Sequence, residues 1–347
     1  MKKIAFILAL LLCLPLLLLG CTSSGNAGTP TTADKVPTQV PTEESTTEQE
    51  PPVKEPETVS LDGKKIIFIG NSFIYYGQTV LEKKQTYLTQ AERANDKGYF
   101  YQLCKANGEE VSVTNWTFGG HTFDHLFGGN CSANRGCDGV DHKSYLTDLN
   151  YDYVVLSASS SAAANDAFWA NIEQITTLFK NANPNVKFVY LCHTSTHGVI
   201  AGTQQKDILN GLKTLEDQGF TVVDWGKLVS DIAKGNVAVP GALQSYNKNS
   251  FIVEKSASDG YHPNQLAGYI TTLMTYCAIT GKSAVGQTYD FAETTWRTFS
   301  QFKSKYYTYN GATTNYPEIF KSESDMKGIQ ELIDQSLEEK PYREYQY

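Results

Sequence analysis

Short apolar runs and amphipathic helical patterns alternate through the middle of the chain, and this alternation limits the fold more than any other feature. The apolar runs predict strands at 65–70, 111–116, 151–156, 186–192 and 220–224. Helical periodicity predicts helices, the first of them interrupted, at 78–106, 167–181, 206–218 and 265–279. Apolar strands separated by helices are typical of a parallel sheet that is buried on both faces. We therefore expect a three-layer α/β/α sandwich with a parallel sheet.

The start of the chain predicts export. Two lysines precede an almost wholly apolar run over 4–19, which is the pattern of a secretory signal peptide. The run closes on a Leu-Leu-Gly-Cys sequence that ends at Cys21 and resembles a bacterial lipobox. That resemblance implies that residues 1–20 are removed and that Cys21 becomes the lipid-modified first residue. An ordinary signal peptide followed by a chance cysteine is the alternative.

Residues 21–58 form a second segment of unusual composition. Positions 22–58 hold nine Thr, six Pro and six Glu, and no aromatic residue. Such a segment cannot bury enough apolar area to offset the entropy that it would lose on ordering. We expect a disordered, lipid-anchored tether that lets the folded part of the chain reach away from the membrane.

The charge of the chain argues against a nucleic-acid partner. Its 29 Lys and Arg residues are outnumbered by 37 Asp and Glu residues, the net charge is −8, and no basic cluster follows the signal peptide. Binding to nucleic acid depends on cationic contacts with phosphate. We therefore expect no nucleic-acid partner. The lipobox predicts a location on the bacterial cell membrane, facing the outside, with the membrane contacted through a lipid on Cys21.

Two cysteines bracket a short polar loop. Cys131 and Cys137 are separated by five residues, and in an oxidising compartment this pair predicts a local disulfide. The alternative is a structural zinc site that also uses His121, His125 and His142, although this cysteine spacing is not usual for zinc ligands. We expect no metal and no other cofactor.

Polar residues and glycines follow the predicted strands. Parallel α/β sheets gather their functional groups at the carboxyl ends of the strands. The candidates at these ends, with two that precede the last core helix, are Ser72, Gly120, Ser159, His193, Asp259 and His262. His193 follows the fourth strand, and this position is compatible with lining a substrate cleft; a polar loop residue without such a role is the alternative.

Three short motifs among these residues resemble the SGNH/GDSL hydrolase superfamily. They are Gly-Asn-Ser-Phe at 70–73, Gly-Gly at 119–120 and Asp-Gly-Tyr-His-Pro-Asn at 259–264. The motifs come in the family's order, and the similarity extends over residues 62–282. It implies a flavodoxin-like sandwich of the SGNH hydrolase type. It also implies a serine esterase, and many members of the superfamily deacylate carbohydrates.

The resemblance implies a role for each matched residue. Ser72 matches the nucleophile, His262 the general base, and Asp259 the carboxylate that orients the histidine. The backbone N–H groups of Ser72 and Gly120 match two donors of the oxyanion hole.

The third oxyanion donor departs from the family's pattern. The family has an Asn soon after the third strand, and Ser159 occupies that position here. Asn165, which comes six residues later, is the alternative. Losing one such donor typically lowers the rate by about 10²–10³, so activity survives the change.

The chemistry of these residue types supports the same assignment. A serine hydroxyl is a weak nucleophile until a base takes its proton, and an imidazole serves as that base near neutral pH. A carboxylate three residues before the histidine can fix the tautomer of the ring. The assignment predicts that Ser72 Oγ lies within about 3–4 Å of a ring nitrogen of His262. The alternatives are that Ser72 only caps a helix and that His262 only belongs to a turn.

The predicted hydrolase-like domain spans 59–282, and a Tyr-rich C-terminal extension follows at 283–347. The extension holds eight of the 21 tyrosines, and we expect it to pack on the domain with a helix over 325–338. Stacking of its aromatic rings on sugars is the alternative. The chain as a whole predicts a cell-surface serine esterase that hydrolyses an ester, such as an O-acetyl group on a carbohydrate. A non-catalytic envelope lipoprotein that binds a glycan or a protein is the alternative function.

Overall fold

The structure of the chain is a computed structural model. It describes residues 57–76, 79–84, 88–127, 139–158, 166–193, 211–247, 250–251, 262–292 and 322–344. The signal peptide, Cys21 and nearly all of the tether lie outside these ranges, so export and lipidation stay predictions. None of the helices in the described ranges combines the length and the hydropathy of a bilayer span.

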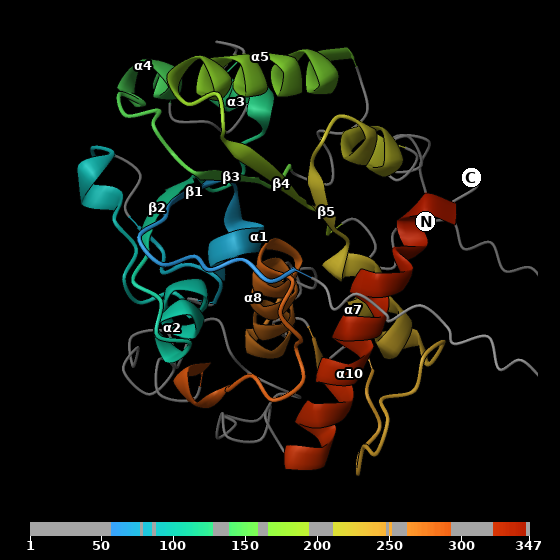
Figure 1. The fold of residues 1–347 in the computed structure, drawn as a ribbon. Helices are drawn as coiled ribbons and strands as arrows, with labels where there is room; N and C mark the ends of the chain where they lie inside the picture. Colours follow the sequence, from blue (N-terminus) through green and yellow to red (C-terminus); the bar gives the residue numbers. More distant parts are fainter. Residues whose placement is uncertain are drawn as a thin grey trace, which may run out of the picture. The chain divides into compact units, whose positions relative to one another are not determined.

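The five predicted strands form one parallel sheet (Figure 1). They are β1 (Lys65–Gly70), β2 (Ser112–Thr117), β3 (Tyr153–Leu156), β4 (Lys187–Leu191) and β5 (Thr221–Val223). Their order across the sheet is β2-β1-β3-β4-β5, and every neighbouring pair is parallel. This is the flavodoxin-like order, in which the chain changes direction across the sheet beside β1. Such a switch point leaves a crevice at the carboxyl ends of the strands, so the end of β1 is the expected position of a site.

Helices cover both faces of this sheet, and the predicted three-layer sandwich is confirmed. On β1, Ile66 and Phe68 belong to one buried apolar cluster, whereas Ile67 and Ile69 belong to another. The helices that contribute to the first cluster are α2 (Tyr99–Ala106), α7 (Trp225–Lys234), α8 (Gln265–Thr280) and α10 (Glu323–Glu339). The opposite face carries α3 (Phe123–Phe127), α4 (His142–Tyr145) and α5 (Asp166–Ala182) (Figure 1). The helix expected over 325–338 is α10, and its apolar side packs in the first cluster.

The helix α7 is missing from the predicted elements, although its buried apolar residues at 225, 228, 229 and 232 have helical spacing. It begins directly after β5, and the Asp224 side chain caps it by accepting a hydrogen bond from Lys227 N at 3.3 Å. Gly235 ends the helix in the left-handed region at a φ of 73°. Because no loop separates α7 from β5, its apolar residues merge with those of the strand in the sequence.

The helix predicted over 78–106 is wrong for its first part. Among the described residues between 79 and 98, the only helical element is a 3₁₀ turn at Ala91–Arg93. Asn95 accounts for the difference. Its Oδ1 accepts the backbone N–H groups of Glu82 and Gly98 at 2.9 and 3.3 Å, and its Nδ2 donates to Glu82 O at 2.8 Å. These bonds between a side chain and the backbone replace the hydrogen bonds of a helix.

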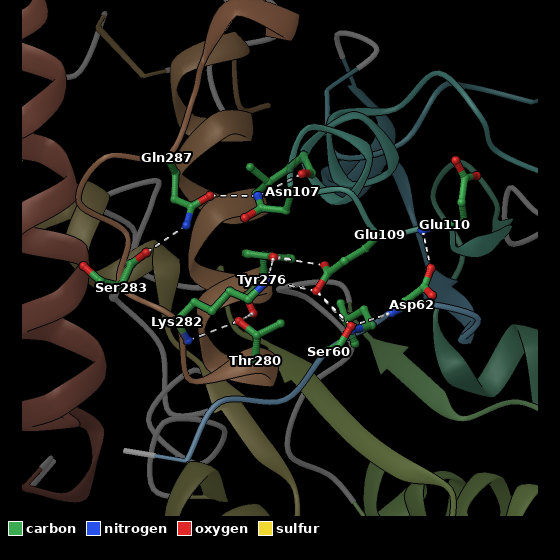
Figure 2. A network of polar contacts seen from close by, with 12 residues as sticks. Ser60, Asp62, Asn107, Glu109, Glu110, Tyr276, Thr280, Lys282, Ser283 and Gln287 are labelled. Carbon is green, nitrogen blue, oxygen red and sulfur yellow. Dashed lines mark hydrogen bonds and ion pairs between the residues drawn. The ribbon is translucent and has the colours of Figure 1, made fainter. Parts of the chain in front are cut away.

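A buried polar network joins the start of the folded chain to the end of α8 (Figure 2). At its centre, Glu109 Oε1 accepts from Leu61 N at 3.2 Å and from Lys282 Nζ at 2.9 Å. Glu109 Oε2 accepts from the Tyr276 hydroxyl at 2.9 Å. Burial and the Glu109 carboxylate raise the pKa of Tyr276, so its hydroxyl keeps the proton that it donates. The network therefore fixes the point at which the chain enters the folded domain.

Replacing Glu109 by alanine is expected to lower the free energy of unfolding by about 3 kcal/mol. The reason is that Leu61 N–H, the Tyr276 hydroxyl and the Lys282 ammonium all lose a buried acceptor. Urea denaturation at pH 7 measures the change. Glu110→Ala is the matched control, because the neighbouring Glu110 side chain is exposed. Equal urea midpoints for the two variants would contradict the structural role of Glu109.

Candidate active site

The strand β1 ends at a glycine because the end of β3 leaves no room for a side chain. A Cβ on Gly70 would lie 2.5 Å from Ser157 O. The next residue, Asn71, caps the short helix α1 (Ser72–Tyr75), since its Oδ1 accepts a backbone N–H of that helix at 3.1 Å. The alternative in which Ser72 serves as the N-cap is therefore wrong. Ser72 is the first residue of α1, and its hydroxyl is not used by the cap.

The turn after β2 lies beside the start of α1. β1 and β2 stay in register up to their last residues, Gly70 and Thr117. Beyond that point, Asn71 Nδ2 donates to His121 O at 3.3 Å. Because Asn71 is only 1% exposed, this hydrogen bond is shielded from water. One buried side chain thus joins the two loops that carry the predicted nucleophile and the predicted oxyanion glycine.

The same turn places Gly120 in a conformation that favours glycine. His121 N donates to Phe118 O at 3.2 Å, and Gly120 has a φ of 73°. Within the described ranges, neither Ser72 N nor Gly120 N donates to a protein acceptor. Two backbone donors on neighbouring loops therefore remain available to a bound anion.

The position of His262 is set by α8. This helix begins after Asn264, whose Oδ1 accepts two backbone N–H groups of the first turn at 3.0 and 3.2 Å. One turn further on, Gly268 packs against the segment after α1, and a Cβ on it would lie 2.2 Å from Thr79 Cβ. The close approach holds the start of α8 against α1. His262, two residues before the cap, is thereby brought to Ser72.

Ser72 and His262 form a hydrogen-bonded pair. The distance from Ser72 Oγ to His262 Nε2 is 2.8 Å, slightly shorter than the roughly 3–4 Å expected from the sequence. The ring of Tyr76 stacks on the His262 ring, with centroids 3.8 Å apart and planes inclined by 11°. The Phe73 ring lies 5.3 Å from His262. A hydroxyl and an imidazole at this separation can act as a nucleophile and its general base.

Arg93 is a buried cation behind the turn after β2. It is 0% exposed, and its Nη1 donates to Asn115 O and Thr117 O at 3.0 and 3.2 Å. Its guanidinium lies 4.0 Å from the centre of the Phe118 ring. Burial raises the pKa of Tyr75 to about 12, and Arg93 opposes that rise only in part, so Tyr75 is neutral at pH 7. Arg93 stands in an irregular stretch, which explains why no periodic pattern singles it out.

His193, which was predicted to line a substrate cleft, is only 1% exposed. Its ring stacks on Phe73, with centroids 4.0 Å apart, and lies 6.3 Å from the Trp225 ring. A Cβ on Gly226 would lie 2.7 Å from the His193 backbone. The first turn of α7, which the predicted elements omit, thus covers the end of β4. His193 supports the residue after Ser72 from inside the core.

Several predicted residues lie outside the described ranges. They are Asp259, Ser159, Asn165, Cys131 and Cys137. The carboxylate that orients His262, the third oxyanion donor and the disulfide therefore stay predictions.

The three histidines of the zinc alternative do lie near one another. The His121 ring is 5.7 Å from that of His125 and 5.2 Å from that of His142. Two ring nitrogens are already used, since His121 Nδ1 donates to Gly119 O at 2.9 Å and His125 Nδ1 accepts from Thr122 N at 3.2 Å. Among the described residues, no set of His, Cys, Asp and Glu side chains is arranged to hold a metal ion.

No family model and no curated protein matches the chain. Among solved structures, 18 chains are similar to it. Axe2, an acetylxylan esterase from Geobacillus stearothermophilus, is 14% identical over 62% of this chain and 92% of its own, with a TM-score of 0.39. A carbohydrate esterase family 2 enzyme plus carbohydrate binding domain from Corynascus thermopiles (Myceliophthora fergusii) is 17% identical over 65% of this chain and 67% of its own, with a TM-score of 0.39. At these identities and TM-scores, function has to be inferred from this chain's own residues.

Proposed function

We propose that the chain is a serine esterase that works through an acyl-enzyme on Ser72. The observation that carries the proposal is the 2.8 Å hydrogen bond between Ser72 Oγ and His262 Nε2. It lies at the carboxyl end of β1, next to the turn that holds Gly120. The resemblance of the surrounding motifs to the SGNH/GDSL superfamily supports the same reaction.

The proposed reaction follows from the properties of these groups. His262 takes the proton of Ser72 as Oγ attacks the ester carbonyl, and the N–H groups of Ser72 and Gly120 stabilise the resulting oxyanion. The protonated His262 then gives its proton to the leaving alcohol. Water, activated by the same histidine, hydrolyses the acyl-enzyme and regenerates the Ser72 hydroxyl. We assign Asp259 the task of orienting the His262 ring.

An O-acylated carbohydrate is the proposed substrate. The support is the export predicted by the first 21 residues, together with the superfamily resemblance, because many members deacylate sugars. In this proposal the protein is lipid-anchored through Cys21 on the outer side of the bacterial cell membrane. The tether over 22–58 then lets the esterase act on glycans at a distance from the membrane.

Ester hydrolysis by the full-length chain tests the proposal. We expect turnover of p-nitrophenyl acetate above the rate with heat-denatured protein. We also expect acetate release from O-acetylated oligosaccharides but not from N-acetylated ones, since an amide is a poorer acyl donor than an ester. A protein that hydrolyses no ester and whose Ser72 does not react with a fluorophosphonate would contradict the proposal. That outcome would favour the glycan-binding alternative.

Gly268→Ala is expected to lower kcat/KM for p-nitrophenyl acetate by about 10²-fold, because the added methyl pushes α8, and His262 with it, away from Ser72. Steady-state kinetics measures the loss. Adding Thr79→Gly removes the atoms that the methyl meets, so the double variant is expected to regain part of the activity. Wild-type kinetics for Gly268→Ala would show that the contact between α8 and the segment after α1 does not hold the pair together.

A further inference from the structure

The ring of Tyr76 occupies one face of the proposed general base. The rings of Tyr76 and His262 are nearly parallel, with planes inclined by 11° and centroids 3.8 Å apart. Tyr76 follows α1 directly, and its backbone N–H donates to Ser72 O. The same helical turn therefore carries both the proposed nucleophile and the ring that stacks on its partner.

Tyr76 differs in its surroundings from the tyrosine beside it. Tyr75 is 8% exposed and belongs to the apolar core, whereas Tyr76 is half-buried. A ring that only filled the core would not need to lie parallel to an imidazole at the edge of a site. We propose that Tyr76 is a positioning residue that holds the His262 ring in the orientation in which Nε2 meets Ser72 Oγ. This inference rests on the proposed esterase function.

Two physical effects support this role. Rotation about the last side-chain bond of a histidine has broad energy wells, so the imidazole can turn away from the serine unless a neighbour blocks it. A parallel ring at 3.8 Å blocks that rotation on one face. The electron-rich face of Tyr76 also attracts the imidazolium that forms when Ser72 gives up its proton. Both effects act on the chemical step rather than on substrate binding, so they concern kcat more than KM.

Kinetics of three variants of the full-length chain test the inference with p-nitrophenyl acetate. Tyr76→Leu removes the ring, and we expect kcat to fall about tenfold while KM changes less than about twofold. Tyr76→Phe keeps the ring, and it is expected to retain most of kcat. Tyr145→Leu is the control for loss of a surface tyrosine, because the Tyr145 side chain on α4 is exposed. If Tyr76→Leu does not fold, Tyr76→Met fills a similar volume without a ring.

A spectroscopic readout separates stacking from general stability. In wild-type protein and in Tyr76→Phe, the carbon-bound ring protons of His262 are expected to be shifted upfield by the neighbouring ring. In Tyr76→Leu that shift is expected to disappear. The His262 signals are identified by their absence in His262→Gln.

The results distinguish failure of this inference from failure of the proposed function. An active wild type with an equally active Tyr76→Leu overturns the positioning role alone. A Tyr76→Phe variant as impaired as Tyr76→Leu also overturns it, because the hydroxyl rather than the ring would then matter. A wild type without esterase activity overturns the proposed function and the positioning role with it.

Discussion

Ser72→Ala is expected to lower kcat/KM for p-nitrophenyl acetate by at least about 10⁴-fold, because no other group can then form the acyl-enzyme. The free energy of unfolding is expected to change little, since Asn71 rather than Ser72 caps α1. Steady-state kinetics and urea denaturation on the same preparation measure the two quantities. The fully unfolded protein gives the background rate.

The same experiment on His262 tests whether the two residues act as one unit. His262→Ala is expected to be impaired to a similar extent, and the double variant is expected to be no worse than either single one. If the two residues acted independently, the fold losses in kcat/KM of the two single variants would multiply in the double variant. A Ser72→Ala variant that keeps a tenth of the wild-type rate would contradict the nucleophile assignment, whatever His262→Ala does.

Asn71→Asp is expected to lower kcat/KM by about 10²-fold, the cost of losing one oxyanion donor. A carboxylate at position 71 can still cap α1, so the helix is expected to begin at the same residue. It cannot donate to His121 O, and it places an acceptor opposite a carbonyl in a position that is 1% exposed. The turn that holds Gly120 is then expected to move away from Ser72.

Kinetics and urea denaturation of Asn71→Asp check this expectation. The free energy of unfolding is expected to fall by about 2–3 kcal/mol. The reason is that the carboxylate at position 71 and the His121 carbonyl, both buried acceptors, then face each other with no hydrogen between them. Asn185→Asp makes the same chemical change at an exposed position and serves as the control. If both variants keep wild-type kinetics, the hydrogen bond between Asn71 and His121 does not position the oxyanion hole.

The part of the fold that local pattern determines was predictable from the sequence. Each predicted strand is present within two residues of its expected ends, because a parallel strand that is buried on both faces needs a continuous apolar run. The helix over 78–106 was predicted incorrectly because the bonds from Asn95 to the backbone at 82 and 98 leave no periodic trace. The burial of His193 depends on α7, which was not among the predicted elements because it follows β5 without a loop.

In the candidate site, too, some residues were predictable from local motifs and others were not. Ser72 and His262 stand in motifs, and the structure brings them to 2.8 Å. Tyr76 and the side-chain amide of Asn71 act through contacts with residues 186 and 50 positions away in the chain, respectively. No pattern of residue spacing in the sequence predicts such contacts, since they form only when α8 and the turn after β2 pack against α1.

Covalent labelling by a fluorophosphonate, followed by mass spectrometry of the peptides, shows whether Ser72 is the nucleophile. We expect one adduct per chain, located on Ser72, and a much slower labelling rate in His262→Gln, because the base that activates the hydroxyl is then missing. Labelling at another residue, or no labelling of a folded protein, would contradict the assignment of Ser72 and His262 as nucleophile and base.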